Sequence, residues 1–177
     1  MVEPLERARE IALETVRWVA GFDFPDREVE CALVALSRPG EYAIERGRIV
    51  SDRGLDIAPP EYDEHFEELH VERSNALQSR LRERGVYLCG PLARYTLNGA
   101  ELSPLALQAA RDAGLGPECR NPFRSIVVRA VELVYACDES LRLIEAYEEP
   151  DGPAVPVEPR VARDDVAEVI LDRELVL

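Results

Sequence analysis

The feature that most constrains the fold is a long run with helical apolar spacing near the C-terminal end of the chain. It begins at Asn121-Pro122, where asparagine can cap a helix and proline suits the first helical position. Apolar residues then follow one face over roughly seven turns, and residues 150–153, rich in proline and glycine, end the run. The members of this face are Ala130, Leu133, Cys137, Leu141 and Ile144. The pattern predicts a helix over about residues 122–148 that buries this face.

Two further helices have clear boundaries. Residues 4–20 repeat apolar side chains at helical spacing and stop before Gly21, a plausible C-terminal cap. Ser103-Pro104 repeats the cap-and-proline signal, and that helix is expected to end near Gly114.

Two shorter helices are predicted between these. Residues 61–69 place Tyr62, Phe66 and Leu69 on one face, with acids in the first turn, where they complement the helix dipole. Residues 74–84 form a basic stretch that also indicates a helix, ended by Gly85.

The remaining patterns indicate strands. The apolar runs 29–36 and 86–89 are short and favour buried strands. Residues 42–44 and 48–50 flank Glu45-Arg46-Gly47 and suggest a hairpin in which Gly47 has a positive φ, while Asn98-Gly99 marks a turn. Together these elements predict an α+β fold, predominantly helical, with a small β-sheet or hairpin.

Charge and hydropathy restrict the partners and the compartment. The chain has 21 basic and 35 acidic residues, and its net charge of -14 repels phosphate backbones and anionic membranes. No apolar run is long enough to span a bilayer, and the first residues are too charged for a secretory signal. A cytoplasmic protein with no nucleic-acid or membrane partner is expected, so its cysteines are expected to be free thiols. These are Cys31, Cys89, Cys119 and Cys137.

Residue chemistry alone assigns no catalytic, cofactor-binding or metal-ligating residue. The cysteines form no Cys-x-x-Cys pair, and Cys31 and Cys137 lie in apolar surroundings typical of small buried hydrophobes. His65 and His70 miss the four-residue spacing of a helical ligand pair, so a solvated acidic face is the preferred interpretation. Weak binding of a metal ion by these histidines and the acids around them is the alternative.

Several longer strings carry a family resemblance. They are Gly47–Ser51 with Gly54–Ile57, His70–Leu77, Tyr87–Asn98, Asn121–Ile126, and Glu132–Ala136 continuing through Ile144–Pro150. In this order, over about residues 14–160, they resemble the large subunit of cytoplasmic nickel-iron hydrogenases, the type linked to nicotinamide or other soluble carriers. Residues 1–160 are therefore expected to form a single domain like the middle of that subunit. Residues 161–177 follow no pattern of the family and form a divergent tail.

The resemblance also implies what this chain does not carry. In that family four cysteines, from two Cys-x-x-Cys motifs, hold a nickel ion bridged to an iron with cyanide and carbon monoxide ligands, and thiolates suit such a centre. An arginine in a Pro-Arg-Gly string lies over the iron, and a partner subunit with iron–sulfur clusters carries electrons. The four cysteines here match none of these positions, so no catalytic role transfers to them and no cofactor is expected. Arg129 and Glu132, three residues apart on a matched helix, are interpreted as a structural ion pair.

These inferences predict a fragment or truncated form of a hydrogenase large subunit. Reversible oxidation of H2 would occur in the complete assembly, with an iron–sulfur small subunit or the missing large-subunit segments as partners. The alternative is a non-catalytic scaffold or interaction module derived from that subunit. Self-association is expected in either case, because the apolar face of the 122–148 helix would lack part of its covering.

Overall fold

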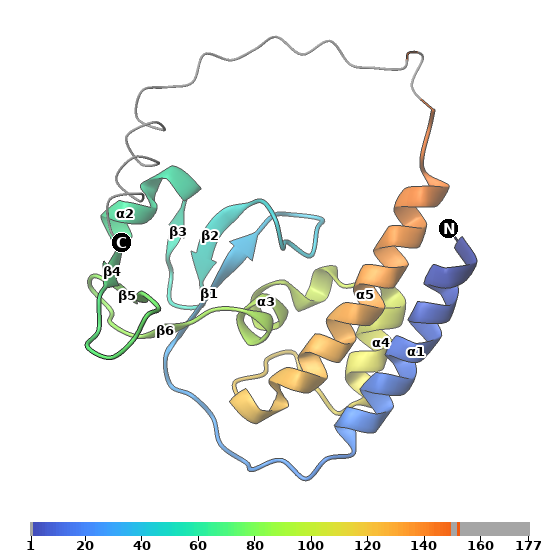
Figure 1. The fold of residues 1–177 in the computed structure, drawn as a ribbon, viewed down its shortest axis with the longest axis horizontal. Coiled ribbons are helices and arrows are strands. Elements are labelled where there is room, and N and C mark those ends of the chain that lie inside the picture. The colour runs from blue at the N-terminus through green and yellow to red at the C-terminus, as the bar shows by residue number, and fades with distance from the viewer. Residues whose placement is uncertain (1, 150–151, 153–177) are drawn as a thin grey trace. The chain divides into compact units, whose positions relative to one another are not determined.

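A computed structural model of the protein describes residues 2–149 and 152, and its elements form the predicted α+β fold (Figure 1). All of them belong to one compact unit that ends at Ala146. The tail predicted for residues 161–177 lies outside the described residues. No helix in the described part of the chain is long and apolar enough to cross a bilayer.

Four helices form the helical half of this unit. They are α1 (Val2–Ala20), α3 (Pro91–Asn98), α4 (Pro104–Asp112) and α5 (Ser125–Glu145). The chain runs in opposite directions in α1 and α5, which pack side by side, and α4 also packs against α5 (Figure 1). Both predicted caps are confirmed: the Ser103 hydroxyl accepts a hydrogen bond from the Ala106 N–H, and the Asn121 side chain accepts one from the Phe123 N–H.

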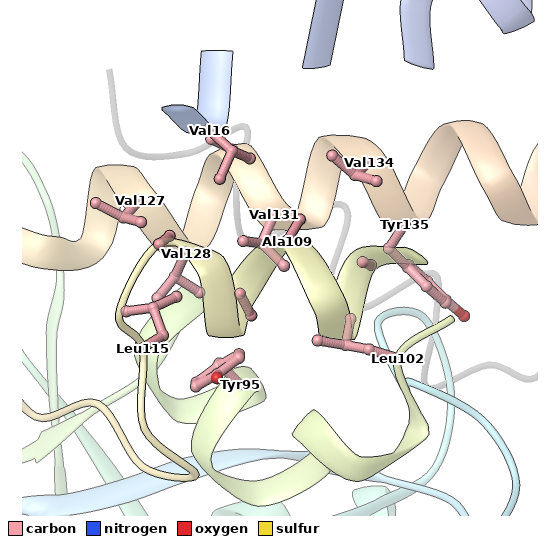
Figure 2. Packing of buried hydrophobic residues seen from close by; sticks show 14 of the residues in the cluster. Val16, Tyr95, Leu102, Ala109, Leu115, Val127, Val128, Val131, Val134 and Tyr135 are labelled. Carbon is pink, nitrogen blue, oxygen red and sulfur yellow. The ribbon is translucent and has the colours of Figure 1, made fainter. Parts of the chain in front are cut away.

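The core of this half is built on α5. Val127, Val131 and Val134 are completely buried, and they share one apolar cluster with Val16 of α1, Tyr95 of α3 and Ala109 of α4 (Figure 2). The predicted face of α5 is therefore partly wrong, since Leu133 is exposed. The buried stripe is rotated from the predicted one because valines, which the sequence interpretation left out, contact α1, α3 and α4.

A mixed four-stranded sheet has the strand order β3-β2-β1-β6. Its strands are β1 (Ala32–Ser37), β2 (Arg48–Ser51), β3 (Asp56–Ile57) and β6 (Tyr87–Leu88). The strand β1 pairs with β2 in antiparallel and with β6 in parallel orientation. The strands predicted at 29–36 and 86–89 are thus confirmed.

The predicted hairpin has the wrong partner strand. Residues 48–51 pair with β1, from Val34↔Ser51 to Ser37↔Arg48, and residues 42–44 lie in the long connection between the two strands. Gly47 does have the expected positive φ, 146°. A Cβ there would lie 2.5 Å from the Ser37 carbonyl oxygen, so only glycine allows this close approach.

Of the two helix predictions in the middle of the chain, the one for residues 74–84 is wrong and the one for residues 61–69 is only partly right. After a 3₁₀ turn at Pro59–Glu61, the helix α2 covers only Tyr62–His65, and Phe66–Leu69 and Gln78–Leu81 form the antiparallel strands β4 and β5. Phe66 lies opposite Leu81, and both are buried, while Glu67 forms an ion pair with Arg80. Such cross-strand pairs stabilise a hairpin and outweigh the local helical spacing.

The helix α3 was not predicted at all. Gly90, with φ of 93°, precedes Pro91 at the first helical position, and Asn98, predicted to start a turn, is the last helical residue. The Asn98 side-chain amide donates to the Leu36 carbonyl oxygen at 2.9 Å, which ties the end of α3 to β1.

Candidate functional site

A cluster of largely buried polar side chains joins α3, α5 and the β1–β2 connection around Glu132. Arg94 of α3 donates through Nε to Oε1 of Glu132 at 2.7 Å and through Nη2 to Oε2 at 2.9 Å. Tyr42 of the connection donates its hydroxyl to the same Oε1 at 2.9 Å. The side chains of all three residues are largely buried. This Tyr42–Arg94–Glu132 cluster therefore links three separate segments through one carboxylate.

The electrostatics of the cluster favour fixed protonation states. Burial, together with the charge of Glu132, raises the pKa of the Tyr42 hydroxyl far above its ordinary value. Hydrogen bonding to Glu132 raises the pKa of the Arg94 guanidinium. The phenol stays protonated and the guanidinium stays charged, so both remain hydrogen-bond donors to the Glu132 carboxylate and hold the three segments together.

The predicted ion pair between Arg129 and Glu132 is wrong, although a structural role for Glu132 fits the geometry. Glu132 is turned toward α3 and Arg94, whereas Arg129 is exposed. Sequence reasoning missed Tyr42 and Arg94 as partners. They lie on other elements, and no spacing rule connects them to Glu132.

An acidic cleft of about 720 Å³ opens beside this cluster. Tyr42 and Tyr135 pack against each other in its wall, with ring centroids 5.1 Å apart. Its charged lining residues are Glu41, Glu45, Glu101, Glu139, Arg46 and Arg142. Arg38 pairs with Glu41 and Arg142 pairs with Glu139, so the arginines offset part of this acidity.

Tyr135 offers no reactive phenolate to this cleft. Burial, with the charges of Glu139 and Glu41, raises the pKa of its hydroxyl, which therefore stays protonated. The cleft can attract a cation, and the phenols in its wall are not nucleophiles at neutral pH.

A second polar cluster lies at one end of the two central strands, where β1 begins and β2 ends. Asp52 accepts a hydrogen bond from the Leu33 N–H at 2.8 Å and forms an ion pair with Arg120. Arg120 also donates to the Cys31 carbonyl oxygen at 3.2 Å. Burial alone would raise the pKa of the Asp52 carboxyl, but Arg120 and the Leu33 N–H outweigh it and hold the pKa below its ordinary value.

The pKa of the Asp52 carboxyl is lower in the folded than in the unfolded state. The ionised carboxylate therefore stabilises the fold above the ordinary aspartate pKa of about 4, and this stabilisation is lost as the pH falls. Asp52→Asn should therefore lower the free energy of unfolding by about 1 kcal/mol at pH 7 and by clearly less at pH 3. Urea unfolding at both pH values measures this. Asp56→Asn, at an exposed pair with Arg48, is the control and should change little. An equal loss for Asp52→Asn at both pH values would contradict the assignment.

The structure places the four cysteines on separate elements. Cys31 precedes β1, Cys89 follows β6 and is exposed, Cys119 is buried before the 3₁₀ turn Pro122–Arg124, and Cys137 lies half-buried within α5. Burial raises the pKa of the Cys119 and Cys137 thiols. The Cys119 N–H donates to Thr96 Oγ1 at 3.2 Å. Cys119 and Cys137 thus behave as protonated, partly or fully buried thiols.

The residues that are present do not fit a nickel-iron centre, which needs four converging thiolates. Within residues 2–149, no three His, Cys, Asp or Glu side chains are grouped so that they could hold a metal ion. His65 ends α2 and His70 follows β4, so a strand separates them and the helical spacing used in the sequence interpretation does not apply.

No protein-family model matches the chain, and no curated protein matches it.

Proposed function

We propose that this chain is a framework portion of a large subunit of the nickel-iron hydrogenase type, and that it does not catalyse by itself. The observation that supports this most strongly is the pair between Arg94 and Glu132. Each residue belongs to a different string that resembles the family, Tyr87–Asn98 and Glu132–Ala136. These two strings are joined by a largely buried bidentate pair.

Other polar residues of the resembling strings make similar contacts. Asn121 donates its side-chain amide to the Pro25 carbonyl oxygen at 2.7 Å, and Arg124 donates to the Ala113 carbonyl oxygen at 2.8 Å. Together with Asn98 on Leu36, these contacts hold helices to loops and to the sheet. Polar side chains used in this way favour a structural role for the strings that carry them.

The chemistry of such a subunit comes from its nickel-iron centre, which supplies reversible oxidation of H2 when it is held by the two cysteine pairs. This chain contributes the packed helices and the small sheet. The expected partners are an iron–sulfur small subunit or the large-subunit segments that bear the cysteine pairs.

Metal content and hydrogen uptake of the purified chain test this proposal. We expect no stoichiometric nickel after chelator treatment and no H2-dependent reduction of a viologen dye, with an intact nickel-iron hydrogenase as the positive control. One nickel per chain that survives the chelator, together with dye reduction, would overturn the non-catalytic role. In that case the cysteines of this chain would have to form a site different from the arrangement described.

A further inference from the structure

We propose that a second copy of this chain docks on an exposed apolar surface formed by α1 and α5, giving a symmetric dimer. This surface, the α1–α5 face, consists of Ile11, Trp18, Phe22, Ile126 and Leu133. Each of these large side chains is between 42 and 69% exposed, which is costly for so many neighbouring apolar groups. The inference concerns the chain by itself and does not depend on the hydrogenase proposal.

The residues of α1 and the turn after it lie on one stripe that points away from α4. Ile11 and Trp18 are seven positions apart and Phe22 follows after four more, so they share one side of the helix. Leu13 and Ala20, on the other side of the buried stripe, border α4. Trp18 and Phe22 already pack edge to face, with ring centroids 5.5 Å apart. A partner would therefore meet partly ordered aromatic side chains, which lowers the entropic cost of docking.

The residues of α5 lie beside this stripe. Ile126 and Leu133, again seven positions apart, share one side of α5, roughly 100–120° around the helix from Glu132, which contacts α3. The helix α1 contacts α5 within about one and a half turns of Leu133, since Arg9 forms an ion pair with Asp138 and its charge lowers the pKa of the Cys137 thiol against the effect of burial. The helices α1 and α5 are antiparallel neighbours (Figure 1). In the proposed dimer, their two exposed stripes border this helix–helix contact and together form the docking surface.

The size of the face matches a small dimer interface. Side chains of this size, about half exposed, present roughly 500 Å² of apolar surface, near the upper end for the largest patch on a monomer. Two such faces would together bury about 1,000 Å² of surface, which is at the lower end of the range for a specific interface. A two-fold axis brings the same patch of both copies together, so an apolar stripe complements itself. Because each copy carries a net charge of -14, added salt should strengthen the association.

Sedimentation equilibrium of the full chain, together with Trp18 fluorescence, tests this proposal. Trp18 is the only tryptophan, so its emission reports on the face directly. We expect a monomer–dimer equilibrium with a Kd of roughly micromolar size, tighter in 1 M than in 0.1 M salt. The Trp18 emission should shift to shorter wavelength as the dimer forms.

Two variants of α5 provide a matched comparison. Leu133→Glu should raise the Kd at least tenfold, whereas Leu143→Glu should leave it unchanged. Leu133 and Leu143 are 54 and 56% exposed, and the two substitutions change the charge equally, but Leu143 lines the acidic cleft instead. Circular dichroism checks that both variants remain folded. A monomer at all concentrations, open-ended aggregates, or equal effects of both variants would overturn the proposal.

Discussion

Replacing Glu132 with alanine is expected to lower the free energy of unfolding by about 3 kcal/mol, the largest effect of any single change to the polar clusters. The substitution leaves the Arg94 guanidinium and the Tyr42 hydroxyl largely buried without the acceptor that both now use. Three segments, α3, α5 and the β1–β2 connection, lose a common anchor. Urea unfolding at pH 7, followed by circular dichroism, gives the value.

Glu139→Ala is the control for this prediction because it removes the same side chain from the same helix. Within the described part of the chain, Glu139 pairs with Arg142, three residues along α5, and Arg142 is well exposed. Its loss should cost less than about 0.5 kcal/mol. If both variants lost the same stability, the Tyr42–Arg94–Glu132 cluster would contribute nothing beyond an ordinary surface ion pair.

Leu92→Ala is expected to cost about 3 kcal/mol through the cavity that it leaves. Leu92 lies on α3, is buried, and belongs to the same apolar core as Val127, Val131 and Val134 of α5. Neighbouring helices can close such a cavity only in part, so the loss exceeds the transfer free energy of the removed atoms. The change in the urea midpoint at constant m-value measures it.

The same truncation at an exposed position separates packing from helix propensity. Leu143→Ala, on α5, should change stability by less than about 0.5 kcal/mol. A loss for Leu92→Ala as small as this would show that α3 is not packed into the core as described.

The long helices could be predicted from the sequence because their signals are local. The capping residues Ser103 and Asn121 form the hydrogen bonds that their side chains indicated, and α1 and α5 have the expected period. The helix α3 was missed because it is short and its start depends on Gly90 in a left-handed conformation. Nothing in the local pattern distinguishes that start from a turn.

The strands β4 and β5 could not be predicted, because each is stabilised by pairing with the other and not by its local sequence. The three-residue spacing of Phe66 and Leu69 fits one face of a helix, but residues 66–69 can also form a strand. The contact between Phe66 and Leu81 favours the strand. The β1–β2 hairpin was misassigned for the same reason. The connecting residues Tyr42 and Ala43 are buried by contacts with distant elements. Residues buried in this way form a short apolar run, and such a run in the sequence predicts a strand.

The sequence interpretation assigned no residue to a site. It named Glu132 only as a structural residue that could pair with Arg129, and Arg129 is not its partner. Tyr42 lies 90 residues and Arg94 38 residues from Glu132 along the chain. Such contacts become visible only when the fold brings the elements together.

The central claim is that this chain supplies the framework of a hydrogenase-type large subunit, and the nucleotide sequence on both sides of its coding region tests it most directly. We predict that the flanks, in the same or a shifted reading frame, encode one Cys-x-x-Cys motif upstream. Downstream they should encode Pro-Arg-Gly followed by a second Cys-x-x-Cys. Unrelated genes on both sides, with separate signals for starting and stopping translation of this chain, would contradict the claim, and its function would then have to be sought in binding.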